Sequence, residues 1–393
     1  MLVCILAALL VLCLAPLAIV GCGSRATAAR QPAPTAAATT GPRPVPTAPT
    51  TAGIVGLQPD VTPTLDSLAS ELDALLVGLE HEGRFSGSVL LAQGDHILLS
   101  RGYGLADRER GMANTPQTRY RLGSVTKQFT AMAVLLLESE GKLDVQDVFC
   151  RYLAGCPPAW QEITIHQLLT HTSGIPNYVL LPGYGRTRAT PALPRELIAR
   201  FRDLPLEFKP GTQFGYSNSG YVLLGAIIEA VSGESYEVFL QEQLFAGLGM
   251  ADSGYEHSQS GLAIGYADAT SRAEPIDMSI PFAAGGLYST VEDLYLWDRG
   301  LMAGGLLENR MFTSYASTPS FGGAGYGYGW YIGEVVGRRW IGHTGKIEGF
   351  AALNSWFPDE QMVVIVLMNR EDLRPAAILQ QIADLLSDRG FRR

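Results

Sequence analysis

Hydrophobic and polar positions along the chain fall into two kinds of repeat. Leucines recur at helical spacing from Leu65 to Leu79, which predicts an amphipathic helix. GSVLLA and HILLSRGYG flank the pair Gly94-Asp95, an arrangement typical of a β-hairpin. Near the end of the chain, WYIGEVV, RRWIGHTG, FAALNSWF and MVVIVLMN have the pattern of antiparallel strands, and ILQQIADLLSDRG that of a closing amphipathic helix.

The segment from residue 124 to about residue 275 is mostly helical or loop-like in pattern. Because the strand segments come from both ends of the chain, we expect one antiparallel sheet built from N- and C-terminal segments and flanked by helices. The middle segment would then be an inserted, mostly helical subdomain, and the fold class would be α/β. Ser124 lies where the two parts meet, and clefts tend to form at such seams.

The first 63 residues have a different composition from the rest. Residues 1–21 carry no charge and read as a signal peptide that ends in Ile19-Val20-Gly21-Cys22. This ending resembles the lipobox of bacterial lipoproteins, which implies cleavage before Cys22 and a lipid on that cysteine. A positive N-terminal region is missing, so retention of the segment as a membrane anchor stays open. Residues 22–63 are rich in Ala, Thr and Pro and predict a tether, which leaves residues 64–393 as the folded domain.

Both alternatives predict an extracytoplasmic protein attached to the cell membrane. In that oxidising compartment, Cys150 and Cys156 are expected to form a disulfide, although two unpaired buried thiols are the alternative. The net charge of -9 argues against a nucleic-acid partner. No glycine-rich phosphate loop or zinc-like spacing of Cys and His occurs in the sequence, so no cofactor and no metal are expected.

The pattern Ser-x-x-Lys occurs twice, at Ser124 with Lys127 and at Ser139 with Lys142. On a helix, residues three apart share one face. Ser139 ends an apolar run and is followed by Gly141, so this pair predicts a solvated helix end. Ser124 opens the same run, where helix N-termini favour developing negative charge. A buried lysine that gives up its proton can act as a base, which makes the first pair a candidate nucleophile and base.

Two further motifs follow in order. Tyr216-Ser217-Asn218 precedes an apolar helical segment, where helix capping by Ser217 or Asn218 is the alternative interpretation. His343-Thr344-Gly345 lies in a predicted late strand. Together the three motifs resemble those of the serine β-lactamase and penicillin-binding protein superfamily. The Tyr-x-Asn form is similar to class C β-lactamases, D,D-peptidases and related esterases, and LLTHTSGI (168–175) and AAGGLYSTVEDLYLW (283–297) also resemble stretches of that family.

The resemblance implies a serine hydrolase that forms an acyl-enzyme with peptide, amide or ester substrates. By this resemblance, Ser124 attacks the carbonyl and Lys127 accepts or holds its proton. Tyr216, as a phenolate or through a shared hydrogen bond, passes a proton to the leaving group. The other implied roles are Asn218 as a partner of Lys127 and of the substrate amide, His343 and Thr344 as cleft walls, and the backbone N–H groups of Ser124 and of Lys346, after Gly345, as the oxyanion hole. Five further residues are expected to be structural: His171, Ser173, Gly285, Gly286 and Asp293.

One departure bears on the substrate. Many β-lactamases of the superfamily have a lysine where His343 stands, and a histidine is largely neutral at pH 7. We therefore expect general acyl hydrolysis of a small-molecule or peptide substrate, with better binding of anionic substrates as His343 is protonated towards pH 6. The alternatives are a penicillin-binding sensor or envelope scaffold without turnover, and a binding lipoprotein. The loop at 177–194 is expected to influence substrate choice.

Overall fold

The computed structural model describes residues 65–257, 261–304 and 306–388. The predicted signal peptide, the predicted lipidation site at Cys22 and the predicted tether lie outside the described residues. Within the described part of the chain, none of the helices combines the length and the apolar character needed to span a membrane.

The described strands are β1 (Gly87–Gln93), β2 (His96–Tyr103), β3 (Leu105–Asp107), β4 (Met112–Ala113), β5 (Tyr120–Arg121), β6 (Gly254–Tyr255), β7 (Leu287–Ser289), β8 (Ala316–Ser317), β9 (Gly325–Tyr326), β10 (Tyr331–Val335), β11 (Arg338–Ile347), β12 (Phe350–Phe357) and β13 (Met362–Met368). The α-helices are α1 (Leu65–His81), α2 (Thr126–Ser139), α3 (Ile165–Leu169), α4 (Tyr184–Thr187), α5 (Pro194–Ala199), α6 (Asn218–Ser232), α7 (Tyr236–Leu240), α8 (Ala246–Leu248), α9 (Phe282–Gly285), α10 (Val291–Met302), α11 (Leu306–Met311) and α12 (Pro375–Asp388). Short 3-10 turns are η1 (Gly123–Val125), η2 (Phe149–Arg151), η3 (Pro158–Trp160) and η4 (Tyr178–Leu180), and η5 (Gln241–Phe245) is a π-helical turn.

The large sheet joins the two ends of the described chain. Its strand order is β2-β1-β13-β12-β11-β10-β9-β8, with antiparallel neighbours throughout. The N-terminal hairpin pairs with the last strand, so that Val89 lies opposite Val366. The α/β class and the sheet built from both chain ends are therefore confirmed.

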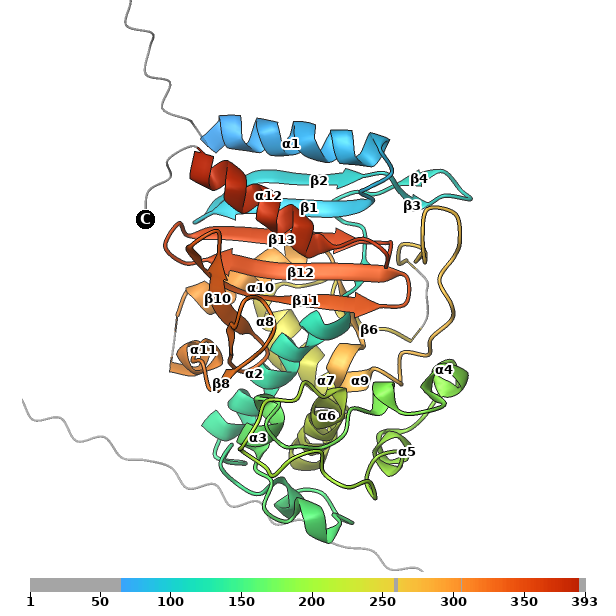
Figure 1. Cartoon of the computed structure of the whole chain (residues 1–393), viewed down its shortest axis with the longest axis vertical. Helices are drawn as coiled ribbons and strands as arrows, with labels where there is room; N and C mark the ends of the chain where they lie inside the picture. The colour runs from blue at the N-terminus through green and yellow to red at the C-terminus, as the bar shows by residue number, and fades with distance from the viewer. Residues whose placement is uncertain (1–64, 258–260, 305, 389–393) are drawn as a thin grey trace, which may run out of the picture. The chain divides into compact units, whose positions relative to one another are not determined.

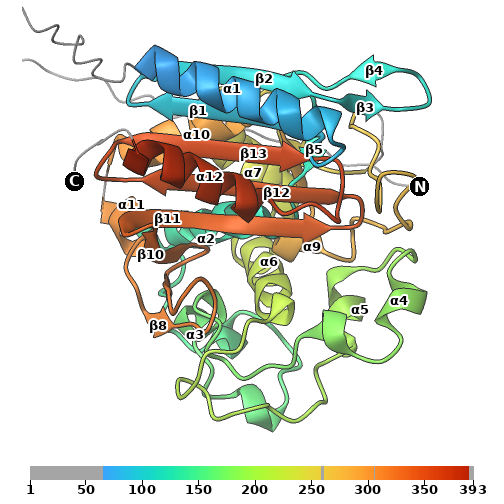
Figure 2. The ribbon, with the colours of Figure 1, turned by 45° about the horizontal axis from the view of Figure 1, so that its top comes forward.

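Strand β13 separates two hydrophobic cores. All seven of its residues are buried, and alternate side chains point to opposite faces of the sheet. Met362, Val364, Val366 and Met368 belong to the core under α1 and α12, whereas Val363, Ile365 and Leu367 belong to the core that includes α2, α6 and α10. Figures 1 and 2 show α1 and α12 together over one face and α10 behind the other. A sheet covered on both faces explains the continuous apolar run MVVIVLM.

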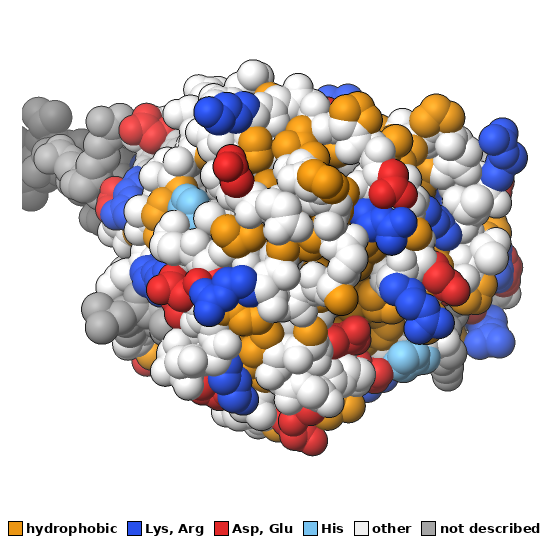
Figure 3. All heavy atoms as spheres, turned by 90° about the horizontal axis from the view of Figure 1, so that it is seen from below, with side chains coloured by type: hydrophobic (Ala, Val, Ile, Leu, Met, Phe, Trp, Pro, Cys, Tyr) orange, Lys and Arg blue, Asp and Glu red, His pale blue; other side chains and the backbone are white. Residues whose placement is uncertain are grey.

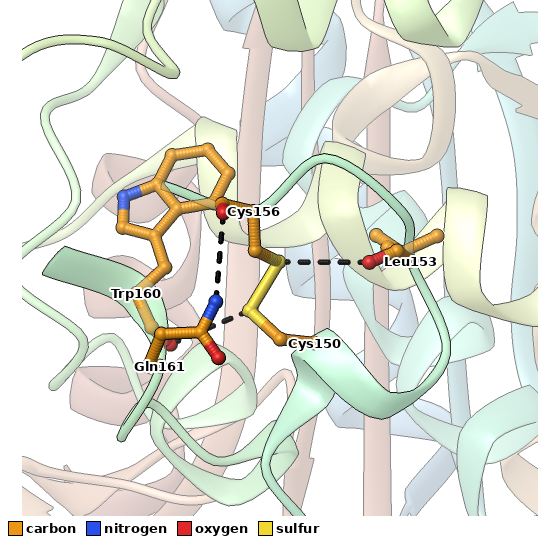
Figure 4. The surroundings of a disulfide bond; sticks show 5 residues. All are labelled: Cys150, Leu153, Cys156, Trp160 and Gln161. Atoms are coloured by element: carbon orange, nitrogen blue, oxygen red, sulfur yellow. Dashed lines mark hydrogen bonds between the residues drawn. A yellow bond between two sulfur atoms is a disulfide. The ribbon is translucent and has the colours of Figure 1, made fainter. Parts of the chain in front are cut away.

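The inserted helical region lies between the N-terminal hairpin and the late strands in sequence, and its helices α3 to α6 lie at one end of the described domain (Figure 1). Cys150 and Cys156, the cysteines expected to pair, form a disulfide there with Cα atoms 5.9 Å apart. Figure 4 shows Gln161 beside this bond, where its Nε2 donates to the Cys156 carbonyl at 3.5 Å. The face in Figure 3 carries basic and acidic side chains interspersed with hydrophobic ones.

Candidate active site

Ser124 lies in the 3-10 turn η1, directly before α2. The predicted helix begins at Thr126, two residues later than expected. Gly123 starts the turn with a φ of 51°, a conformation that glycine adopts without the steric cost of a side chain. The preceding Leu122 donates its backbone N–H to the Leu287 carbonyl at 2.9 Å, which ties the turn to β7. This turn presents the Ser124 side chain to a cavity.

Lys127 lies one helical turn after Ser124 and is completely buried. Its Nζ is 3.1 Å from Ser124 Oγ, 2.8 Å from Asn218 Oδ1 and 2.8 Å from the Ala284 carbonyl oxygen. Burial lowers the pKa of this amine well below its usual value. A neutral amine has two hydrogens and one lone pair. Asn218 and Ala284 can only accept at these atoms, so they take both hydrogens and leave the lone pair for the Ser124 hydroxyl.

The second Ser-x-x-Lys pattern has no such surroundings. Ser139 ends α2 and donates its hydroxyl to the Leu136 carbonyl at 2.8 Å. Lys142 is exposed and forms an ion pair with Glu140 at 2.8 Å. These are the contacts of a solvated helix end, as the sequence predicted for this pair.

The Tyr-x-Asn motif places two side chains beside Lys127. The Tyr216 ring centroid lies 5.0 Å from Lys127 Nζ. Burial raises the pKa of the Tyr216 phenol well above its usual value, while an interaction with Ser124 acts in the opposite direction. Tyr216 is therefore a neutral phenol in the resting site. Ser217 is the N-cap residue of α6 but makes no capping bond through its side chain, and Asn218 is the first helical residue.

Asn177 holds this motif in place, and sequence reasoning did not identify it. Its Oδ1 accepts from the backbone N–H of Asn218 at 3.1 Å and from Asn218 Nδ2 at 3.3 Å. Its Nδ2 donates to the Tyr216 carbonyl at 3.4 Å. With Nδ2 of Asn218 engaged in this way, Oδ1 of Asn218 faces Lys127. The only sequence signal was position, because Asn177 follows the family-like LLTHTSGI stretch by two residues.

The His-Thr-Gly strand approaches the Ser124 turn through its backbone. A Cβ on Gly345 would overlap the Leu122 carbonyl oxygen and lie 3.1 Å from the Ser124 backbone nitrogen. A Cβ on Gly123 would lie 2.9 Å from the backbone nitrogen of Lys346. Two glycines therefore allow β11 and η1 to lie in backbone contact, with the nitrogens of Ser124 and Lys346 on adjoining segments. Thr344 is half-buried on the same strand.

The expectation that His343 lines the accessible cleft and titrates near pH 6 is wrong. His343 is 2% exposed and does not line the cavity at Ser124. Its ring instead lies under the site, 6.2 Å from the Tyr216 ring between centroids. Burial lowers the pKa of His343 to about 3. A histidine in this place is neutral across the physiological range and offers no switchable charge to a substrate.

The cavity at Ser124 has a volume of about 310 Å³. Its walls include Ser124, Asn218 and Lys346, together with Tyr178, Val179, Tyr184 and Arg188 from the 177–194 loop. Arg188 forms an ion pair with Glu348 at 3.0 Å, which joins that loop to the end of the sheet. Among the described residues, no group of three or more His, Cys, Asp and Glu side chains is arranged to hold a metal ion.

Comparison with known proteins agrees with this geometry. The family model described as Beta-lactamase matches residues 65–387, which include every residue of the site. The chain therefore belongs to the beta-lactamase family. The recognition made from the three motifs is confirmed.

Several relatives of this beta-lactamase family member have been described. The putative penicillin-binding protein PbpX of Bacillus subtilis is 32% identical over 295 residues, covering 72% of this chain and 71% of that protein. The esterase EstB of Burkholderia gladioli is 35% identical over 229 residues, covering 54% and 57%. The octameric penicillin-binding protein homologue from Pyrococcus abyssi has a similar structure, with a TM-score of 0.72, 32% identity and coverage of 81% of this chain and 77% of the other.

Proposed function

We propose that this family member is a serine acyl hydrolase in which Ser124 is the nucleophile and Lys127 its base. The observation that carries the proposal is the environment of Lys127. Its Nζ lies 3.1 Å from Ser124 Oγ while burial lowers its pKa and two acceptors occupy its hydrogens. An amine in this state can take the hydroxyl proton as the serine attacks.

The reaction proceeds in two acyl-transfer steps. Ser124 Oγ bonds to the substrate carbonyl carbon, and its proton moves to Lys127. The backbone N–H groups of Ser124 and Lys346 stabilise the negative oxygen of the tetrahedral intermediate. Tyr216 donates a proton to the leaving group as its bond to carbon breaks, and the proton held by Lys127 restores the phenol. Water then releases the acyl group from Ser124, with the same groups acting in reverse.

The proposed substrates are peptides, amides or esters. Supporting this range, the relatives of more than 30% identity include a putative penicillin-binding protein and an esterase. Because His343 is buried and neutral, the site does not use a charge at that position to bind a substrate carboxylate. The proposal includes attachment outside the cytoplasm, through a lipid on Cys22 or a retained signal segment, supported by the apolar first 21 residues and the Gly21-Cys22 pair.

A three-substrate panel tests the proposal. The protein and its Ser124→Ala variant are incubated with a chromogenic β-lactam, a short-chain nitrophenyl ester and a peptide ending in D-Ala-D-Ala. Steady turnover is followed together with the intact mass of the protein. We expect turnover of at least one substrate, and its loss in Ser124→Ala. Equal turnover by the folded variant contradicts the proposal. Stoichiometric acylation without turnover would instead favour the penicillin-binding sensor.

A further inference from the structure

A row of buried aromatic side chains runs beneath Tyr216 and connects two motifs of the site. His171 follows α3, Tyr326 ends β9 and His343 lies in β11. Their exposed fractions are 1%, 0% and 2%. The centroids of the His171 and Tyr216 rings are 4.2 Å apart, so the Tyr216 phenol packs directly against His171.

The partners at the two ends of the row fix the protons on both histidines. The backbone N–H of Ser217 donates to His171 Nδ1 at 3.2 Å, so Nδ1 carries no proton. His343 Nδ1 lies 2.6 Å from the carbonyl oxygen of Thr344, which can only accept, so this Nδ1 carries the proton. Neutral His171 is therefore protonated on Nε2, and neutral His343 has its lone pair on Nε2.

Tyr326 links the two histidines, and its hydrogen bonds to them can run in only one donor-to-acceptor direction. Its hydroxyl lies 3.2 Å from His171 Nε2 and 3.1 Å from His343 Nε2. The hydroxyl has one hydrogen to donate. The neighbouring Tyr221 hydroxyl, which also lies within hydrogen-bonding reach of Tyr326, already donates to the Leu169 carbonyl at 3.0 Å and accepts from the Gly329 backbone N–H. Tyr326 therefore accepts from the protonated Nε2 of His171 and donates to the unprotonated Nε2 of His343. Each polar atom along the row then has a partner of the opposite kind, as buried polar groups require.

We propose that His171, Tyr326 and His343 are positioning residues for acyl transfer, acting as a one-directional hydrogen-bonded strut between the Tyr-x-Asn turn and the His-Thr-Gly strand. One end holds Ser217, between Tyr216 and Asn218. The other end holds Thr344, two residues before the Lys346 N–H of the proposed oxyanion hole. The strut sets the spacing between the proton donor and the oxyanion site, and small errors in such spacing cost rate.

This inference rests on the proposed function for its kinetic consequence. Tyr326→Phe keeps the ring and removes the hydroxyl. We expect kcat to fall about tenfold with KM within about twofold, because the substrate still binds while the reacting groups lose their alignment. Tyr328→Phe is the matched control. Tyr328 is equally buried and its hydroxyl lies 2.8 Å from His166 Nδ1, a tyrosine and histidine pair outside the row.

The tautomers provide a measurement that needs no activity. In the wild-type protein with 15N-labelled histidine at neutral pH, we expect His171 protonated on Nε2 and His343 protonated on Nδ1, assigned with His171→Gln and His343→Gln. A proton on the other nitrogen of either ring overturns the strut. So does a kcat in Tyr326→Phe that falls no further than in Tyr328→Phe. Undiminished turnover in Ser124→Ala would count against the proposed function and leave the tautomers as predicted.

Discussion

The proposed chemistry depends on the protonation state of one residue, Lys127. Its amine lies between two acceptors and a hydroxyl in a fully buried position. The nearby ring of Tyr216 favours a cation there, but burial has the larger effect and lowers the pKa. A lowered lysine pKa means that the base is available above that pKa and is lost as pH falls through it.

The first prediction is a rate plateau that is reached well below the pH at which an ordinary lysine loses its proton. We expect kcat/KM to level off there, since burial lowers the pKa of Lys127 well below its usual value. Lys127→Arg should lose acylation by at least about a hundredfold, because a guanidinium does not give up its proton. The pH dependence of ester hydrolysis, with thermal unfolding as a control for folding, checks both. A rate that continues to rise towards pH 10.5 would mean that Lys127 has the pKa of an ordinary lysine.

The second prediction also concerns a single residue, Lys346, and its effect on the binding of charged substrates. Among the charged side chains that line the cavity, Arg188 pairs with Glu348, and Glu371 accepts from the Gly349 N–H at 2.6 Å. Lys346 is exposed at the wall beside Ser124. Its cation, rather than His343, is placed to meet a substrate carboxylate.

Lys346→Ala should lower kcat/KM for carboxylate-bearing substrates about two- to fivefold relative to a neutral ester, the size expected for an exposed charge. Added salt should reduce the difference. Arg339→Ala, an exposed cation of the same strand that does not line the cavity, is the control. An unchanged ratio of anionic to neutral substrates would remove Lys346 from substrate recognition.

At the scale of elements, the site depends on how closely β11 approaches the turn η1. A methyl group on Gly345 would overlap the Leu122 carbonyl, and backbone cannot move aside as a flexible side chain can. Gly345→Ala should therefore separate the strand from the Ser124 turn and abolish most activity, with a loss of stability of about 1–3 kcal/mol. The measurement is kcat/KM together with urea unfolding.

Gly78→Ala is the matched control for this substitution. Gly78 lies within α1, and nothing is found within 4 Å of the added Cβ. Alanine should stabilise that helix by up to about 1 kcal/mol without changing activity. Full activity in Gly345→Ala would show that the backbone contact is not needed for catalysis.

The same elements show what sequence could and could not predict. Periodicity identified α1, the β1–β2 hairpin, the late strands and α12, because these segments have a consistent apolar pattern over many residues. Motif order brought Ser124, Lys127, Tyr216 and Asn218 together correctly. The burial of His343 was not predictable, because it depends on Tyr326 and on ring packing from segments distant in sequence. Asn177 and Tyr326 were missed for the same reason: their partners are tertiary.

At the scale of the whole molecule, two buried neutral histidines link stability to pH. Burial lowers the pKa of His171 well below its usual value and that of His343 to about 3. The unfolded chain protonates near pH 6.5, whereas the folded chain does not. The full contribution to stability is therefore present above about pH 6.5, and it is lost progressively as pH falls towards the folded pKa.

The lowered pKa of His343 sets the expected size of this pH dependence of stability. Between pH 8 and pH 5, the free energy of unfolding of the wild type should fall by about 2 kcal/mol because of His343. The His343→Gln variant lacks this contribution. The stability advantage of the wild type over this variant should therefore shrink by that amount. Urea unfolding at the two pH values measures it, with the exposed His96→Gln as control. If the stability difference between the wild type and His343→Gln is the same at both pH values, His343 has the same pKa in the folded and unfolded states.

Covalent labelling tests the role of Ser124 as the nucleophile. The protein is treated with a fluorophosphonate, and the modified residue is located by mass spectrometry of the intact chain and its peptides. We predict one label per chain, on Ser124, with normal labelling of Ser139→Ala and none of Ser124→Ala. Both variants must keep the wild-type unfolding transition for the comparison to count. A label retained by folded Ser124→Ala, or found on another serine in the wild type, would show that Ser124 is not the nucleophile.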